Sequence, residues 1–277
     1  MLSVIVPVYN ESETVGQVLA EISSSLTEVS HEIIVVDDGS TDGSRESLKG
    51  IDGIKLIRHS ENCGYGYSIK AGIREARGED IAIIDADDTY PACRIPEMLA
   101  LMSTHQMVVA TRKPLPPLNY LAKMILRGLV WILTRSRVPD LNSGLRIFKK
   151  ELAVRYMNLL PDGYSFTTTL TIACLSNHHR IAYLPIDYRM RRGQSKLRPL
   201  REFFKFIILI IRLVTYFKPL EVFLPASAFL FLAGVAVGFY SLIVYHRVMD
   251  VTMIILILFS LQIALLGLLA DLINRKK

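Results

Sequence analysis

The chain has 277 residues, a net charge of +6 and 51% hydrophobic residues. Its mean hydropathy of +0.34 is high for a soluble protein, and the apolar excess begins near Arg201, so a mixed region precedes an apolar one. The basic balance fits an anionic partner, and the lack of helix-turn-helix or zinc-finger patterns excludes the common nucleic-acid binders and favours a membrane. Three isolated cysteines, odd in number and without a CxxC pair, argue against a disulfide framework or a zinc site and fit a reducing compartment.

The first half alternates short β-branched runs with segments of helical spacing. We expect strands at residues 2–8, 32–36, 54–58 and 80–84, and helices at 13–26, 44–49 and 67–77, with Gly78 as a helix C-cap. The first run is too short for a signal peptide and lacks a basic flank. This βαβ rhythm predicts a mainly parallel sheet covered by helices, an α/β fold. In such sheets, ligands bind beyond the carboxyl ends of the strands.

Two amphipathic segments follow. Residues 118–135 combine apolar side chains with Lys123, Arg127 and the only tryptophan, which indicates either a helix in a membrane interface or a core helix of the domain. Residues 197–219 form a similar juxtamembrane helix, and Arg212 in its middle argues against a span. The first domain is therefore expected to cover residues 1–196.

The last part, residues 220–277, predicts two transmembrane helices at about 222–246 and 251–271, joined by a very short connector. At about 1.5 Å per residue, each crosses a hydrocarbon core of about 30 Å. Basic residues before the first span and at the C-terminus place both ends of this hairpin in the cytoplasm, together with the first domain. We favour the plasma membrane of a bacterium or archaeon over the endoplasmic reticulum. Two helices are too few to enclose a lipid path, which leaves a homo-oligomer open.

Two acidic clusters end predicted strands. Asp85 and Asp87 flank the small Ala86, and two carboxylates so placed suit Mg²⁺ and a diphosphate. The alternative is a solvated acidic loop. Residues 37–44, Asp-Asp-Gly-Ser-Thr-Asp-Gly-Ser, suit either a tight turn that caps the next helix or a carboxylate that accepts hydrogen bonds from a nucleoside.

Four motifs stand in the order and spacing of family-2 glycosyltransferases with the GT-A fold. They are Val6-Pro7-Val8-Tyr9-Asn10-Glu11, Val35-Val36-Asp37-Asp38-Gly39-Ser40, Asn62-Cys63-Gly64 and Asp85-Ala86-Asp87. The resemblance covers about the first two-thirds of the chain. Within the family the chain most resembles the polyprenyl-phosphate glycosyltransferases, the group that contains dolichol-phosphate mannose synthase. Three later motifs add support: Ala110-Thr111-Arg112, residues 140–146 (Asp-Leu-Asn-Ser-Gly-Leu-Arg) and residues 193–197 (Gly-Gln-Ser-Lys-Leu).

The resemblance implies roles for individual residues. The nucleotide-sugar would be bound by Pro7, Tyr9, Glu11, Val36, Asp38, Asp85 and Ala86, and Mg²⁺ or Mn²⁺ by Asp85 and Asp87. The acceptor phosphate or the donor diphosphate would meet Arg112, Ser143, Arg146, Arg191, Arg192, Ser195 and Lys196. Catalysis would depend most on Asp87, Arg112 and Lys196. Two positions depart from the family pattern: Thr89 replaces a glutamine and Met190 an arginine.

The expected reaction transfers a sugar from a UDP- or GDP-sugar to undecaprenyl or dolichyl phosphate. A phosphate monoester carries a charge of about −1.5 to −2, so it needs no general base, and a single in-line displacement would invert the anomeric carbon. Arg191 or Arg192, with Lys196, would hold the two anions together, although the same basic run also suits anionic lipid headgroups. The alternatives are a membrane glycosyltransferase with another acceptor and a non-catalytic membrane adaptor that keeps the fold.

Overall fold

A computed structural model describes residues 1–113, 130–131, 134, 136–189, 208–209, 212–246 and 251–275. The chain divides into two compact units, Met1–Phe206 and Ile207–Lys277. Most of the expected interfacial helix at 118–135 lies outside the described residues, as does the first part of the expected helix at 197–219. The described part of the latter is helical at 208–209 and 212–217.

The first unit is built on one seven-stranded sheet with the order β3-β2-β1-β4-β6-β5-β7. The strands are β1 (Leu2–Val8), β2 (His31–Asp37), β3 (Ile54–Arg58), β4 (Asp80–Ile83), β5 (Met107–Lys113), β6 (Arg146–Lys149) and β7 (Ile181–Asp187). Only β6 runs antiparallel to its neighbours β4 and β5; the other described pairs are parallel. The prediction of a mainly parallel sheet is confirmed.

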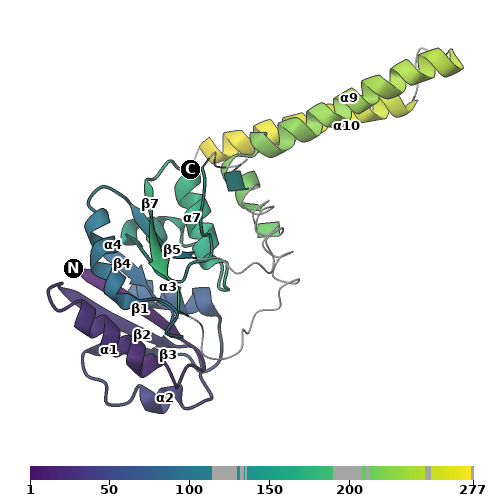
Figure 1. Ribbon diagram of the computed structural model, residues 1–277. Coiled ribbons are helices and arrows are strands. Elements are labelled where there is room, and N and C mark those ends of the chain that lie inside the picture. The colour runs from purple at the N-terminus through teal and green to yellow at the C-terminus, as the bar shows by residue number, and fades with distance from the viewer. Residues whose placement is uncertain are drawn as a thin grey trace. The chain divides into compact units, whose positions relative to one another are not determined.

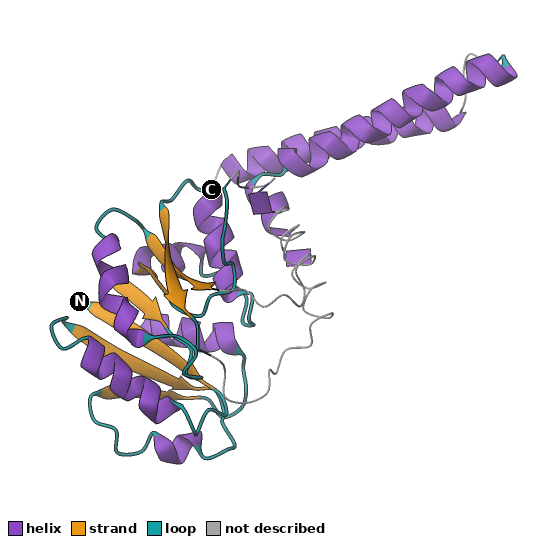
Figure 2. Cartoon of the chain, viewed as in Figure 1, coloured by secondary structure: helices purple, strands orange, loops and turns teal. Residues whose placement is uncertain are grey.

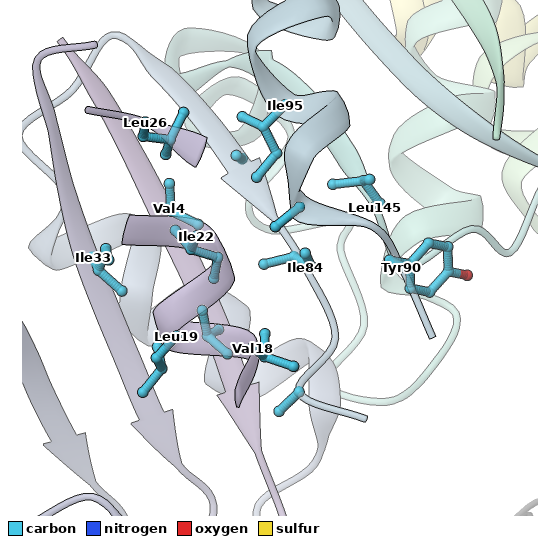
Figure 3. Packing of buried hydrophobic residues seen from close by; sticks show 14 of the residues in the cluster. Val4, Val18, Leu19, Ile22, Leu26, Ile33, Ile84, Tyr90, Ile95 and Leu145 are labelled. Carbon is cyan, nitrogen blue, oxygen red and sulfur yellow. The ribbon is translucent and has the colours of Figure 1, made fainter. Parts of the chain in front are cut away.

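Helices cover the sheet on both faces (Figures 1 and 2). They are α1 (Val15–Ser25), α2 (Ser44–Ser47), α3 (Tyr65–Glu75), α4 (Ile95–Leu101) after the 3₁₀ turn η1 (Ala92–Arg94), α6 (Lys150–Tyr156) and α7 (Phe166–Ser176). Alternate residues of β1, including Val4, pack with Ile22 of α1 and Ile95 of α4 in the main core cluster (Figure 3). Ile5 lies on the opposite face against Gly72 of α3. Burial on both faces is why these strands are continuous apolar runs.

The prediction that Gly78 caps a helix is wrong. Helix α3 ends at Glu75, and the next residue, Ala76, already has an extended ψ of 137°. Gly78 instead lies against β1, where a Cβ atom would stand 2.6 Å from the Met1 carbonyl oxygen and 2.7 Å from the Ser3 nitrogen. Its N–H donates to the Ser3 hydroxyl at 2.8 Å. Glycine is therefore needed for a close approach of two chain segments.

The second unit consists of α9 (Leu220–Tyr245) and α10 (Val251–Arg275), which pack side by side (Figure 1). Both are long and apolar enough to cross a membrane. Gly234, Gly238 and Gly267 face side chains of the other helix at close range, the pattern by which helices approach in lipid. The Ser227 hydroxyl donates to the Ser260 carbonyl at 2.8 Å. Large apolar side chains such as Phe229 point outward, 71% exposed. Such a surface requires a lipid or another apolar environment.

Candidate active site

The functional side chains collect at one edge of the sheet, where β1, β2 and β4 end. From β1 the strand order continues to β2 and β3 on one side, and from β4 it continues to β6, β5 and β7 on the other. The boundary between β1 and β4 is therefore the switch point, where parallel sheets bind ligands. Because β6 runs antiparallel, its first residue, Arg146, pairs with Ile83 near the end of β4 and with Val109 of β5. One edge thus receives the ends of β1, β2, β4 and β5 together with the beginning of β6.

The acidic pair Asp85 and Asp87 follows β4 at this edge. The Tyr65 hydroxyl donates to an Asp85 carboxylate oxygen at 2.8 Å. The Thr89 hydroxyl donates to an Asp87 oxygen at 2.6 Å. The Thr14 hydroxyl of the α1 N-terminus donates to the carbonyl of Ala86 at 2.7 Å. Two other segments therefore fix the loop, and within the loop Thr89, which replaces the usual glutamine, orients Asp87.

The electrostatics of this pair favour a cation. Burial, followed by the negative charge of Asp87, raises the pKa of Asp85 to about 6. Two carboxylates that oppose each other's ionisation are stabilised when a divalent ion lies beside them. Oxygen donors are the ligands that Mg²⁺ and Mn²⁺ prefer. Asp85 and Asp87 thus fit the expected metal.

A backbone segment crosses directly over Asp85. A Cβ atom at Gly144 would overlap the Asp85 carboxyl group, standing 2.7 Å even from its farther oxygen. The Gly144 N–H donates to the Tyr90 hydroxyl oxygen at 2.8 Å. The loop before β6 therefore touches the acidic pair, and only glycine allows that contact.

Asp38 directly follows β2 and organises the turn before α3. One of its oxygens accepts the Cys63 N–H at 3.0 Å, and the other accepts the Gly64 N–H at 2.9 Å. The His59 ring nitrogen Nδ1 lies 2.7 Å from the first oxygen. Gly64 has φ +108° and contacts Asp162. Glycine at position 64 thus allows the turn before α3 to approach the backbone of Asp162 closely.

Asp37 has a different set of partners. Its two oxygens accept the Ser40 N–H at 2.9 Å and the Arg45 Nε–H at 3.1 Å. Burial alone would raise the pKa of Asp37, but the hydrogen bonds from Ser40 and Arg45 hold the pKa below its ordinary value. Of the two neighbouring aspartates, Asp37 therefore fixes the turn that leads into α2.

Arg112 is the last residue but one of β5, at the same edge of the sheet. Its Nε and Nη2 atoms donate to the two oxygens of Asp140, at 2.7 and 2.8 Å, and its guanidinium lies 5.4 Å from the centre of the Tyr188 ring. Burial would lower the pKa of Arg112, but the hydrogen bonds that it donates to Asp140 raise the pKa above the ordinary value. The bidentate pair fixes a permanent positive charge near Asp85. Nothing in the sequence pattern indicated Asp140 as its partner.

Arg146 and Ser143 have partners other than the expected phosphates. Both are fully buried. The Arg146 guanidinium donates to the carbonyls of Leu141, Ser143 and Thr167 and to the Thr171 hydroxyl, and the Ser143 hydroxyl donates to a backbone carbonyl. Burial lowers the pKa of Arg146. Arg146 therefore joins the loop that contacts Asp85 to α7, and its influence on a ligand is indirect.

The other predicted residues fall into two groups. Pro7, Val36 and Ala86 are buried, while Tyr9 and Glu11 are partly exposed beside the β1 end. The Glu11 N–H donates to the Ser44 hydroxyl at 2.9 Å, which joins the loops after β1 and β2. The expected phosphate contacts Arg191, Arg192, Ser195 and Lys196 lie outside the described residues, so their roles stay predictions.

A charged clamp, Asp88 with Arg189, was not foreseen from the sequence. Arg189 Nη1 donates to Asp88 at 2.7 Å and to Glu21 at 2.8 Å, and the Arg189 N–H donates to the Thr89 carbonyl at 3.0 Å. Asp88 has φ 58°, a conformation that Asp and Asn tolerate best among residues with side chains. The clamp ties the chain after β7 to the loop that carries Asp85 and Asp87.

Asp88→Asn and Asp88→Ala are expected to differ. Asparagine keeps the backbone conformation and removes the charge, so we expect weaker Mn²⁺ binding with little change in the thermal midpoint. Alanine adds a backbone cost of about 1–2 kcal/mol and should lower the midpoint as well. Calorimetry of both variants measures the thermal midpoint and the Mn²⁺ affinity. Glu75→Gln, which breaks the exposed pair with Lys55, is the control. Equal midpoints for the two Asp88 variants would contradict the role of the backbone conformation.

Metal affinity should depend on pH through Asp85. Protons compete with the cation, so Mn²⁺ affinity should fall as the pH is lowered through about 6. Because Asp85 binds its proton more tightly when folded, the metal-free protein should lose stability as the pH rises through the same range. Tyr65→Phe removes a hydrogen bond that lowers the Asp85 pKa, and should move the transition to higher pH. Mn²⁺ titrations of the wild type and of Tyr65→Phe at several pH values test this shift, with Tyr164→Phe as the control. If the transition of Tyr65→Phe stayed at the wild-type pH, the role of Asp85 would be contradicted.

Solved structures share this fold. Glucosyl-3-phosphoglycerate synthase from Mycobacterium tuberculosis, crystallised with Mn²⁺, uridine diphosphate and phosphoglyceric acid, superimposes with a TM-score of 0.62, with 22% identity over 78% of each chain. The glycosyl transferase family 2 model matches residues 3–148, more than half of the chain. The chain therefore belongs to glycosyl transferase family 2. A second model, the GtrB C-terminal hairpin, matches residues 218–275. Together these confirm the resemblance, the GT-A fold and glycosyltransferase activity as the class of enzyme.

Curated relatives transfer sugars on polyprenyl phosphates. A dolichyl-phosphate hexose transferase of Haloferax volcanii is 29% identical over 72% of this chain and 87% of its own length. A dodecaprenyl-phosphate galacturonate synthase of Rhizobium johnstonii is 26% identical over 99% of this chain and 88% of its own. A dolichol-phosphate mannosyltransferase of Pyrococcus furiosus is 26% identical, and the match spans 64% of its length. The names of all three relatives pair a sugar transferase or synthase with a polyprenyl phosphate.

Proposed function

We propose that this enzyme transfers a sugar from a UDP- or GDP-sugar to a polyprenyl phosphate such as undecaprenyl or dolichyl phosphate, with inversion at the anomeric carbon. The observation that carries the proposal is the union, in one chain, of the acidic pair at the sheet edge with an apolar hairpin of the GtrB type. An anchored enzyme of this kind meets an acceptor that itself lies in the membrane. The names of the relatives support the same acceptor class.

The described residues supply most of what the donor needs. Asp38, together with the loop after β1, would receive the nucleoside. Asp85 and Asp87 would hold Mg²⁺ or Mn²⁺, which neutralises the donor diphosphate as the leaving group departs. Arg112, held rigid by Asp140, places a positive charge near the same phosphates.

The acceptor phosphate supplies its own nucleophile. Its oxygen attacks the anomeric carbon as the bond to the donor diphosphate breaks, so one displacement completes the transfer. No side chain has to remove a proton, because the phosphate monoester is already anionic. The protein's contribution is to hold two anions in line, for which we propose Arg191, Arg192, Ser195 and Lys196. A product with retained anomeric configuration would contradict this mechanism.

The test is a transfer assay with the full chain in detergent. Labelled UDP- and GDP-sugars are offered with undecaprenyl or dolichyl phosphate and Mn²⁺ or Mg²⁺. We expect label to enter the organic phase only when both lipid and divalent ion are present, and EDTA should abolish the transfer. Label that moves only to a soluble acceptor would overturn the polyprenyl proposal. A protein that binds nucleotide but transfers to no acceptor would favour an adaptor.

We further propose that the catalytic unit lies on the cytoplasmic side of a bacterial or archaeal plasma membrane. The basic residues that flank the two apolar helices support this orientation through the positive-inside rule. The exposed Cys63 and Cys93 provide a readout. A membrane-impermeant maleimide should label them in inverted vesicles only, and labelling of intact spheroplasts would contradict the proposal.

A further inference from the structure

Three side chains of different chemistry converge where β2 and β3 end. Asp38 follows β2, His59 follows β3, and Cys63 stands in the turn before α3. One donor atom from each lies within 4.8 Å of the others, and the Asp38 carboxylate and His59 Nδ1 are 2.7 Å apart. The cluster is separate in sequence from Asp85 and Asp87.

This donor set differs from the acidic pair in its metal preference. A thiolate and an imidazole are softer ligands than carboxylates, and together with one carboxylate they match the ligands of Zn²⁺. Mg²⁺ and Mn²⁺ prefer oxygen donors, as in the pair after β4. The two clusters should therefore discriminate between classes of divalent ion.

The backbone holds these donors in place before any ion binds. The His59 N–H donates to the Asp37 carbonyl at 2.9 Å, and the Asp38 N–H donates to the Val8 carbonyl at 2.8 Å. The His59 ring packs edge-on against Tyr67, with the ring centres 5.0 Å apart. Cys63 is exposed. Two donors are thus fixed to the sheet, and the third is open to ions from solvent.

The local charge also attracts a cation. Desolvation, followed by the negative charges of Asp38, Glu61 and Asp162, raises the pKa of the Cys63 thiol. The same negative charges favour a divalent ion, which would displace the thiol proton to solvent as the sulfur–metal bond forms.

We propose that Asp38, His59 and Cys63 form a binding site for a zinc-class divalent ion, and that an ion bound there excludes the donor nucleotide. The second half of this inference rests on the proposed function, in which Asp38 receives the nucleoside. Three protein ligands leave one position of a tetrahedral ion open to water. The site would make the enzyme sensitive to zinc while its reaction depends on magnesium or manganese.

Cobalt is the probe for the site itself. The full chain in detergent, freed of any affinity tag and kept in excess Mg²⁺, is titrated with Co²⁺. We expect a thiolate-to-cobalt charge-transfer band that saturates at one equivalent and disappears when Zn²⁺ is added. Cys63→Ser should abolish the band, whereas Cys93→Ser, which changes the other exposed thiol, should keep it. No band in the wild type, or a band that survives Cys63→Ser, would overturn the site.

Inhibition tests the link to the donor. In the transfer assay with excess Mg²⁺, Zn²⁺ should inhibit the wild type in competition with the nucleotide-sugar. Because the variant removes a ligand itself, Cys63→Ser should be at least about 10-fold less sensitive, measured against its own zinc-free rate. Equal sensitivity of both proteins would overturn the inhibitory role. The cobalt spectrum needs no transfer activity, so failure of the proposed function would not be confused with failure of the metal site.

Discussion

Asp87→Asn is expected to lower the rate of sugar transfer by about 10³-fold, equivalent to about 4 kcal/mol of transition-state stabilisation. Asparagine has the shape of aspartate, and its oxygen still accepts the Thr89 hydroxyl that lies 2.6 Å from the carboxylate. The substitution therefore removes the negative charge with little change in the loop. The loss should come from weaker metal and diphosphate binding.

Two measurements separate this effect from misfolding. The thermal midpoint of Asp87→Asn without metal should equal that of the wild type or exceed it, because the variant removes the repulsion that raises the Asp85 pKa. The gain in midpoint on adding Mn²⁺ should largely disappear. Asp52→Asn, in an exposed turn, is the matched control and should keep full activity. A variant that still transfers sugar at the wild-type rate would exclude Asp87 as a metal ligand.

Gly144→Ala should impair both stability and activity, although the substitution adds a single methyl group. A Cβ atom at this position overlaps the Asp85 carboxyl group, so either the loop or the carboxylate must move. Forced overpacking costs about 1–3 kcal/mol. Because the displaced group is a proposed metal ligand, we expect Mn²⁺ affinity to fall by a larger factor than the affinity for nucleotide alone.

The control for Gly144→Ala is Gly16→Ala. Gly16 lies in α1 with no atom within 4 Å of an added Cβ, so this change should leave activity intact and stabilise the helix slightly. Denaturation curves and Mn²⁺ titrations of both variants give the comparison. If Gly144→Ala bound Mn²⁺ as the wild type does, the contact between the loop and Asp85 would have no functional importance.

The strands of the first half were predictable because burial on both faces leaves a continuous apolar run. β1 and β3 match the expected bounds, and β2 and β4 differ by a residue or two. The later half was harder. β6 has only four residues, and its antiparallel direction depends on pairing with β4 and β5, which lie far away in sequence. Helix α7 is buried nearly all round, so it has no amphipathic period to recognise.

The site shows the same division between local and distant signals. Asp85 and Asp87 were predictable because they directly follow a strand. The side chains that hold this loop in place were not predictable. The Tyr65 hydroxyl donates to Asp85 from 20 positions away in sequence, and the Arg189 guanidinium donates to Asp88 from 101 positions away. Arg146 shows the converse: its motif indicated a phosphate contact, whereas full burial gives it backbone carbonyls as partners.

The described site residues all belong to the Met1–Phe206 unit, and α9 and α10 contribute none of them. The hairpin would then affect how often the enzyme meets its acceptor, and it would take no part in the chemical step. An enzyme held at the bilayer meets a lipid acceptor at the effective concentration set by the membrane surface, with the translational freedom of both partners already reduced. The soluble donor gains nothing from this confinement. The two substrates should therefore differ in how strongly their apparent KM depends on the anchor.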